Sequence, residues 1–139
     1  MLQVIQTLSY LHVVVVAAAG FILGWLWYSV LFGRAWREEM KITPQAMEDC
    51  GGRMCPMLAT GFFFMLLSTF GLAVLIAAHH SENALKGAEL GAFVGAIVVG
   101  GQMLNSAIWE NRSARLLRIN LGYEIVLFAL QGALLGCWH

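Results

Sequence analysis

From Met1 to Gly33 the chain contains no Asp, Glu, Lys or Arg, and three further charge-free stretches follow at residues 54–81, 90–109 and 125–139. An α-helix rises about 1.5 Å per residue, so roughly 20 apolar residues cross a hydrocarbon core of about 30 Å. Because unpaired backbone groups are too costly inside a bilayer, such stretches form helices. The sequence therefore predicts an all-α fold, an integral membrane four-helix bundle.

The composition agrees with this fold class. Hydrophobic residues make up 60% of the chain and charged residues only 12%, whereas soluble domains carry about 25% charged residues. We expect spans at about residues 9–32, 56–78, 88–109 and 119–138, which leaves residues 1–139 as a single transmembrane domain. The net charge of zero argues against nucleic acid as a partner, since its binding needs a basic surface.

The basic residues are distributed unequally between the predicted connections. Seven of the eight lie after the first or the third span, and only Lys86 lies between the second and third. The positive-inside rule assigns the basic side to the cytoplasm. We therefore expect both termini outside, most simply in a bacterial inner membrane. The seven residues are Arg34, Arg37, Lys41, Arg53, Arg112, Arg115 and Arg118.

The 34–55 connection is the one sizeable aqueous segment. Residues 34–41 are expected to extend the first helix, Thr43-Pro44 to cap a new helix and Gly51-Gly52 to end it. This predicts a short interfacial helix on the cytoplasmic side, with its basic residues against anionic lipid. Membrane lipids are thus the first expected partner.

Small residues recur at every fourth position. Such spacing lets membrane helices approach until their backbones touch. Packing inside one bundle and a seam between protomers both fit this pattern, and we expect a homo-oligomer, with a dimer as its simplest form. The helix-packing candidates are Gly20, Gly24, Gly91, Gly95, Gly132 and Gly136.

Glu124 is the acidic residue placed well inside a predicted span. It lies six residues after Arg118, so it is roughly 9 Å from the inner face. Convergence of polar side chains from all four helices would satisfy the carboxyl group, either as a hydrogen-bonded latch or as a proton- or solute-binding site. The candidate intramembrane polar site consists of Tyr28, Thr60, Gln102, Asn105, Asn120, Glu124 and Gln131.

Metal and catalytic signals are weak. Cys50 and Cys55 lie near Met54 and Met57 in a soft-sulfur patch, but their spacing matches no metal motif. His79 and His80 are weak candidates on the outer side. No P-loop, HExxH, GxSxG or CxxC motif occurs, so we expect neither a cofactor nor an enzyme.

Three parts of the chain resemble a known family. They are residues 24–36 (GWLWYSVLFGRAW), residues 108–113 with 117–123 (IWENRS and LRINLGY) and residues 132–138 (GALLGCW). The chain resembles domain-of-unknown-function family 1761. The resemblance implies a small four-helix membrane protein and supplies no mechanism. Where that family carries Glu-Gly-Arg this chain has Asn111, which tolerates a left-handed turn nearly as well as glycine.

Two classes of function fit these features. Transport or permeation of a small solute, with or without proton coupling, needs polar groups facing the interior of a bundle or oligomer. A structural or accessory subunit of a larger membrane complex needs only lipid-compatible faces and a partner seam. A lipid- or small-molecule-binding protein overlaps both classes. We expect transport or permeation through an oligomer first, with the accessory subunit and the binding protein as alternatives.

The charge asymmetry predicts the topology directly. Single cysteines from Gln3→Cys and Glu82→Cys, in a background without native cysteines, should react with an impermeant maleimide in intact cells, because both positions are expected outside. Gln45→Cys should be protected until the membrane is permeabilised. Labelling of Gln45→Cys with protection of the other two positions would reverse the assignment.

Overall fold

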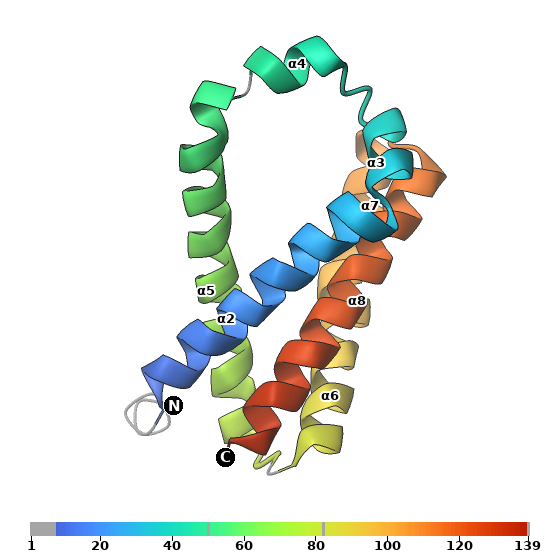
Figure 1. Ribbon diagram of the computed structural model, residues 1–139. Coiled ribbons are helices and arrows are strands. Elements are labelled where there is room, and N and C mark those ends of the chain that lie inside the picture. Colours follow the sequence, from blue (N-terminus) through green and yellow to red (C-terminus); the bar gives the residue numbers. More distant parts are fainter. Residues whose placement is uncertain (1–7, 50, 82, 139) are drawn as a thin grey trace.

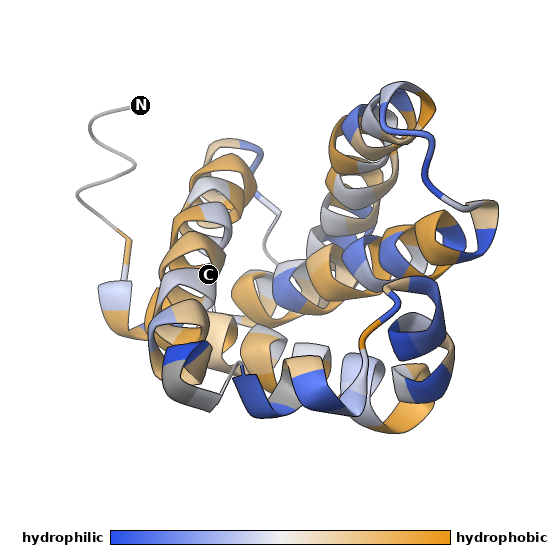
Figure 2. Cartoon of the chain, turned by 90° about the horizontal axis from the view of Figure 1, so that it is seen from above, coloured by the Kyte–Doolittle hydropathy of each residue, from blue (hydrophilic) through white to orange (hydrophobic). Residues whose placement is uncertain are grey.

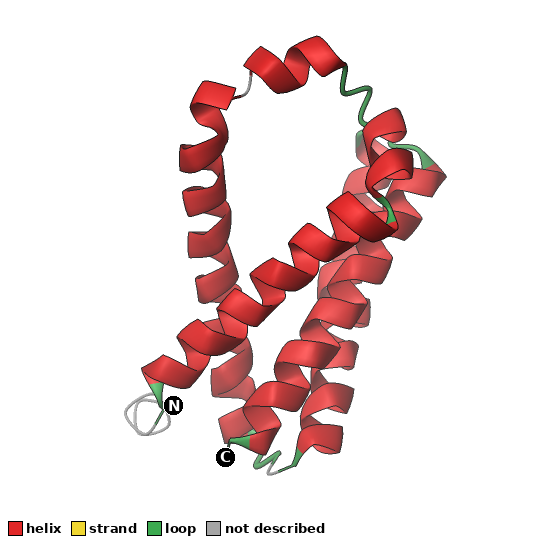
Figure 3. Cartoon of the chain, in the orientation of Figure 1, coloured by secondary structure: helices red, strands yellow, loops and turns green. Residues whose placement is uncertain are grey.

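The computed structural model describes residues 8–49, 51–81 and 83–138, and helices make up nearly all of this part (Figures 1 and 3). Two six-residue segments, η1 and η3, have π-helical hydrogen bonding and continue the helices before them. In chain order the elements are α2 (Tyr10–Trp25), η1 (Leu26–Leu31), α3 (Gly33–Glu39), α4 (Pro44–Asp49), η2 (Gly51–Arg53), α5 (Met54–Ala78), α6 (Ala84–Phe93), η3 (Val94–Val99), α7 (Gly100–Trp109) and α8 (Ala114–Cys137).

Four helices among the described residues are long and apolar enough to cross a membrane, which confirms the predicted fold class. They cover Tyr10–Leu31, Met54–Ala78, Ala84–Trp109 and Ala114–Cys137. The last two begin earlier than predicted because a polar side chain caps each of them. The Asn83 side chain accepts a hydrogen bond from the Lys86 amide, and Ser113 accepts one from the Leu116 amide.

The connections of the bundle lie at two opposite ends. The 79–83 connection and the first and last described residues lie at one end, and α3, α4 and the 110–113 turn lie at the other, here called the α4 end (Figure 1). Hydrophilic residues are concentrated in the short helices and connections, whereas the long helices are mainly hydrophobic (Figure 2). The α4 end thus carries the seven basic residues that are the basis of the predicted topology.

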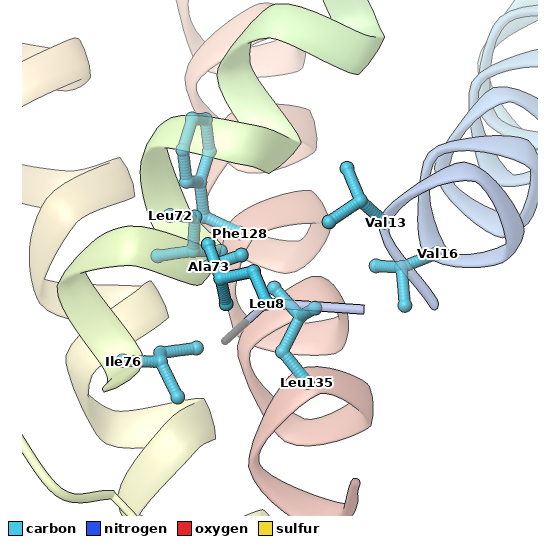
Figure 4. Close-up of a cluster of buried hydrophobic side chains, with 8 residues drawn as sticks. All are labelled: Leu8, Val13, Val16, Leu72, Ala73, Ile76, Phe128 and Leu135. Atoms are coloured by element: carbon cyan, nitrogen blue, oxygen red, sulfur yellow. The ribbon is translucent and has the colours of Figure 1, made fainter. Parts of the chain in front are cut away.

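The core is formed where α2, α5 and α8 meet, away from the α4 end. Each helix contributes apolar side chains spaced three or four residues apart, the spacing of one helix face. The first half of α5 contributes nothing to this core, because residues 54–61 are exposed. The cluster in Figure 4 consists of Leu8, Val13, Val16, Leu72, Ala73, Ile76, Phe128 and Leu135.

Glycines allow α6 and α8 to lie in direct backbone contact. A Cβ added at Gly87 would overlap the Gly132 carbonyl oxygen, and one at Gly91 would overlap that of Phe128. At Gly95 the nearest atom is the Glu124 carbonyl oxygen, 2.9 Å from the Cβ position. The small-residue face of the third membrane helix therefore packs inside the protomer.

The other predicted packing glycines also face neighbours in the same chain. At Gly20 an added Cβ would lie 2.6 Å from Gln131 Nε2, and at Gly24 it would lie 2.9 Å from the Tyr123 hydroxyl. At Gly136 it would lie 2.5 Å from the Asn83 carbonyl oxygen. Since these faces are occupied, an oligomer seam must use another surface.

The connection between the first two membrane helices contains two short helices. Helix α3 is separate from the first membrane helix, because Phe32 leaves the helical conformation (φ −121°, ψ 9°) and Lys41 after α3 is left-handed (φ 53°). The predicted continuous extension of residues 34–41 is therefore wrong. As predicted, α4 begins after Thr43, whose hydroxyl accepts a hydrogen bond from the Ala46 amide at 3.2 Å.

The glycine contacts predict an asymmetric effect of two similar substitutions. Gly91→Leu should lower the free energy of unfolding by about 3 kcal/mol, the upper end for overpacking, because the contacting atom belongs to the α8 backbone and cannot rotate away. Gly71→Leu is the matched control, since no atom lies within 4 Å of its Cβ position on α5. Unfolding in a graded detergent mixture measures both variants. Equal stability of the two would contradict the assigned contact.

Candidate functional site

The segments 24–36 and 117–123, which lie far apart in the sequence, contact each other near the α4 end. The Trp27 indole Nε1 donates a hydrogen bond to the Ile119 carbonyl oxygen at 3.2 Å. The Tyr28 hydroxyl donates one to Asn120 Oδ1 at 3.1 Å. Both donors come from η1, and π-helical segments occur frequently at functional sites. This pairing joins the first membrane helix to the last.

Tyr123 lies between the aromatic side chains of η1. Its ring centre is 5.0 Å from that of Tyr28 and 6.2 Å from that of Trp27. Gly24 leaves room for the Tyr123 hydroxyl, and Gly122 leaves room for the Trp27 ring, which is 3.3 Å from the Cβ position. These glycines therefore permit the aromatic contacts that hold η1 on α8.

Glu124 is half-buried beside this aromatic cluster. Its carboxylate is close enough to interact electrostatically with the hydroxyls of Tyr28 and Tyr123. No hydrogen bond of the Glu124 side chain is found within the part of the chain that the structure describes. A carboxyl group in this position therefore has capacity left to bind a proton or a polar partner.

The other predicted polar residues are not all brought to Glu124. Asn120 joins the cluster through Tyr28. Thr60 is exposed on α5, and its hydroxyl donates to the Pro56 carbonyl oxygen at 2.8 Å. Gln102 and Asn105 are exposed on α7. The expected convergence of all four helices is therefore wrong for Thr60, Gln102 and Asn105, because these residues face outward from the bundle.

Gln131 forms a separate buried polar cluster in the middle of the bundle. Its side chain is 0% exposed, and Nε2 donates to Thr69 Oγ1 at 2.9 Å and contacts Met65 Sδ at 3.3 Å. Thr69 in turn donates to the Met65 carbonyl oxygen at 2.7 Å. Gln131 Oε1 is buried and has no partner among the described residues. This cluster latches α5 to α8. The sequence analysis missed Thr69, although its hydroxyl in mid-span was a usable signal.

A large groove lies between the first half of α5 and the first and last membrane helices. Its volume is about 760 Å³, within the usual range for small-molecule sites. The lining residues are mainly aromatic and apolar, and those with a side-chain hydroxyl are Tyr28, Ser29 and Tyr123. We call it the α2–α5 groove. It is lined by Phe21, Ile22, Gly24, Trp25, Tyr28, Ser29, Trp36, Met54, Leu58, Gly61, Met65 and Tyr123.

The α2–α5 groove exists because α5 packs only through its second half. The buried α5 residues are Thr69, Leu72, Ala73 and Ile76, all distant from Met54. Helix α4 spans the distance between α3 and the start of α5 (Figure 1). Trp25 is 64% exposed although it lines the groove, so the groove opens to the outside of the bundle at the level of the membrane helices.

A second, smaller cleft lies between α7 and α8. Its volume is about 440 Å³, and Gln102, Ser106 and Asn120 line it together with apolar side chains and Arg112. Two of the predicted polar residues thus share one cleft, which has no lining residue in common with the α2–α5 groove.

Polar and charged side chains at the α4 end connect α3 to the start of α8 and the end of α7 to the turn that follows it. Ser113 donates a hydrogen bond to Glu39, and Arg115 lies 3.4 Å from Glu38. Ser106 and Arg112 donate to the Glu110 carboxylate, and these hydrogen bonds lower the pKa of that group below its usual range. Asn111 is left-handed (φ 51°), which confirms the turn expected at that position.

The structure does not assemble the weak metal candidates into a site. Cys55 is exposed, and Cys50 lies outside the described residues. His79 Nδ1 lies 3.3 Å from the Ser81 hydroxyl, and His80 is exposed. Among the residues that the structure describes, no group of three His, Cys, Asp or Glu side chains is placed to hold a metal ion.

Comparison with known families finds one family whose model covers nearly the whole chain. A family model described as "Protein of unknown function (DUF1761)" matches residues 11–136, nearly the whole chain. The chain belongs to this family. No curated protein and no solved structure matches it. Membership in DUF1761 is consistent with the membrane-spanning architecture and assigns no activity.

Proposed function

We propose that this DUF1761 protein binds a membrane amphiphile in the α2–α5 groove. The observation that carries the proposal is a groove of about 760 Å³ that opens between membrane-spanning helices. Lipid tails are the molecules available at that depth of a bilayer. Lipid or small-molecule binding was one of the alternatives left open by the sequence, and the groove favours it.

The lining suits a molecule with an apolar tail and a polar head. Aromatic rings supply large apolar contact areas, while the hydroxyls of Tyr28, Ser29 and Tyr123 supply hydrogen-bonding groups. Ser29 is exposed, and no hydrogen bond of its hydroxyl is found among the described residues. A bound molecule that satisfied it would therefore gain binding energy from a group already placed at the groove.

The charge near the groove favours an anionic head group. Trp36 and Met54 line the α4 end of the groove, and their neighbours in the chain are Arg37 and Arg53. Both arginines are exposed. Basic side chains at this level attract anionic lipids. We therefore propose a fatty acid or a similar single-tailed anionic amphiphile as the ligand.

A variant that fills the groove tests this proposal. The protein in liposomes is labelled with a diazirine-bearing fatty acid, and unlabelled fatty acid is added as competitor. Labelling should be saturable and should map to peptides of α2, η1 and the first half of α5. Gly61→Trp should lower the saturable labelling at least about tenfold. The indole would occupy part of the groove, so the ligand would lose its contacts with the groove walls there.

Gly71→Trp is the matched control, because Gly71 is also exposed on α5 but does not line the groove. Its labelling should equal that of the unmodified protein. Labelling that no competitor reduces, or that Gly61→Trp leaves unchanged, would show that lipid contacts this surface without specific binding and would contradict the proposal.

Transport of a small solute, with or without proton coupling, is the second candidate function. The observation that favours it is the half-buried Glu124 carboxyl beside Tyr28 and Tyr123, without a hydrogen bond of its own among the described residues. Ionisable groups inside membrane spans commonly mark transport paths. Only Tyr28 and Asn120 of the predicted polar set accompany Glu124, so a path would follow the face of α8 next to η1.

Glu124→Gln separates a transport role from a structural one, since glutamine keeps the shape and hydrogen-bonding capacity of the side chain but cannot ionise. We expect the variant to fold normally and to lose any proton flux that the unmodified protein shows in liposomes loaded with a pH-sensitive dye. Equal flux in both proteins would eliminate the carboxylate from transport. Gln131→Leu serves as a control for loss of a polar group elsewhere on α8.

The cellular setting is part of the same proposal. We propose a bacterial inner membrane, with both termini extracytoplasmic and α4 as a cytoplasmic interfacial helix. An accessory role in a larger membrane complex is the remaining alternative. Such a role predicts no saturable fatty acid labelling, so the groove experiment also distinguishes it from amphiphile binding.

A further inference from the structure

Two carboxamide side chains face outward from the third membrane helix. Gln102 and Asn105 are exposed on α7, and neither forms a side-chain hydrogen bond within the described part of the chain. They lie seven and four residues before Trp109, the end of the span. At about 1.5 Å per residue, these positions are about 10 Å and about 6 Å inside that end of the helix.

Amides at this depth need a partner. An unpaired amide in hydrocarbon is costly, because the bilayer core offers neither donors nor acceptors. Thr60 provides a contrast on α5: it is also exposed, but its hydroxyl donates to the Pro56 carbonyl oxygen of its own helix. The side chains of Gln102 and Asn105 form no such hydrogen bond within their own helix in the described part of the chain.

We propose that the α7 face containing Gln102 and Asn105 is the interface of a homodimer. A carboxamide both donates and accepts hydrogen bonds, so it pairs with a second carboxamide of the same kind. Two copies inserted in the same direction, related by a two-fold axis along the membrane normal, bring identical residues together at identical depth. A second copy of this chain therefore supplies hydrogen-bonding partners for both amides, and no other protein is needed.

The backbone at this face permits close approach. Gly101 is exposed, and no atom lies within 4 Å of its Cβ position. It immediately precedes Gln102 and lies one helical turn before Asn105, so a partner helix meets no side chain between the two amides. Small residues beside polar ones are typical of membrane helix interfaces. The partner would also cover the α7–α8 cleft, which Gln102 lines.

This interface differs from the glycine seam considered from the sequence. The Gly91 and Gly95 face is occupied by α8 of the same protomer, whereas Gln102 and Asn105 are exposed and Gln102 lines only the open α7–α8 cleft. The proposed α7 interface is also separate from the proposed amphiphile site, because no residue of α7 lines the α2–α5 groove. Failure of the groove experiment would leave the dimer proposal unaffected.

Cysteine crosslinking in membranes tests the interface. The native cysteines are first replaced by serine, and Ile97→Cys is then introduced one turn before Gly101. Oxidation should give a dimer band for Ile97→Cys. Phe64→Cys on α5 is the control, since the native side chains are similarly exposed (61% for Ile97 and 59% for Phe64), and it should give no dimer band above background.

Removing the amides should weaken the interaction. Gln102→Leu with Asn105→Leu, added to Ile97→Cys, should weaken dimerisation by about tenfold, as expected for loss of interhelical hydrogen bonds. Thr60→Val should leave the dimer band unchanged. Both leucine substitutions are at exposed positions and should preserve folding, which detergent unfolding checks. Equal bands for Ile97→Cys and Phe64→Cys, or a dimer that persists without the amides, would overturn the proposal.

Discussion

The backbone contact between α6 and α8 is the constraint on which the other contacts of the bundle depend. Gly87, Gly91 and Gly132 remove side chains from this line, so the two helices meet through carbonyl oxygens and α-carbons. Between membrane helices, packing of this kind replaces the hydrophobic driving force that is missing in lipid. With α8 held on one side by α6, its remaining faces are available for α2 and for the second half of α5.

Packing along α8 differs between the two halves of the bundle. Near Gln131 the helices are close together, and the amide, Thr69 and Met65 form a buried latch. Nearer the α4 end, α5 leaves the bundle and Tyr123 instead packs on η1. The same helix thus supports a closed core and one wall of an open groove. The groove belongs to the half where packing is weakest, as is usual for ligand sites.

The polar residues of the membrane helices fall into three sets, and each set has a different physical consequence. Gln131 and Thr69 are joined by a hydrogen bond inside the protomer, and Gln131 Oε1 stays without a partner among the described residues. Tyr28, Asn120 and Glu124 lie together beside the groove. Gln102 and Asn105 are exposed on α7 without a side-chain hydrogen bond among the described residues, and they form the interface of the proposed dimer. This separation argues against one central polar site and favours a groove and an interface formed by different residues.

The sequence by itself determined the membrane class, the number of long helices and the caps at Thr43 and Asn111, because length, charge and turn chemistry are local properties. Only the tertiary structure decided which polar groups meet. Helices that are apolar on every side show little periodicity in hydrophobicity. The buried face of α5 around Thr69 and Ile76 therefore cannot be distinguished by sequence from the face exposed to lipid. The depth of a polar side chain along its helix follows from counting residues. The direction in which it points around the helix axis is set by packing against neighbouring helices. For that reason residue counts place Tyr28, Gln102 and Glu124 at similar depth, but only the packing decides that Glu124 lies beside Tyr28 and that Gln102 is exposed on α7.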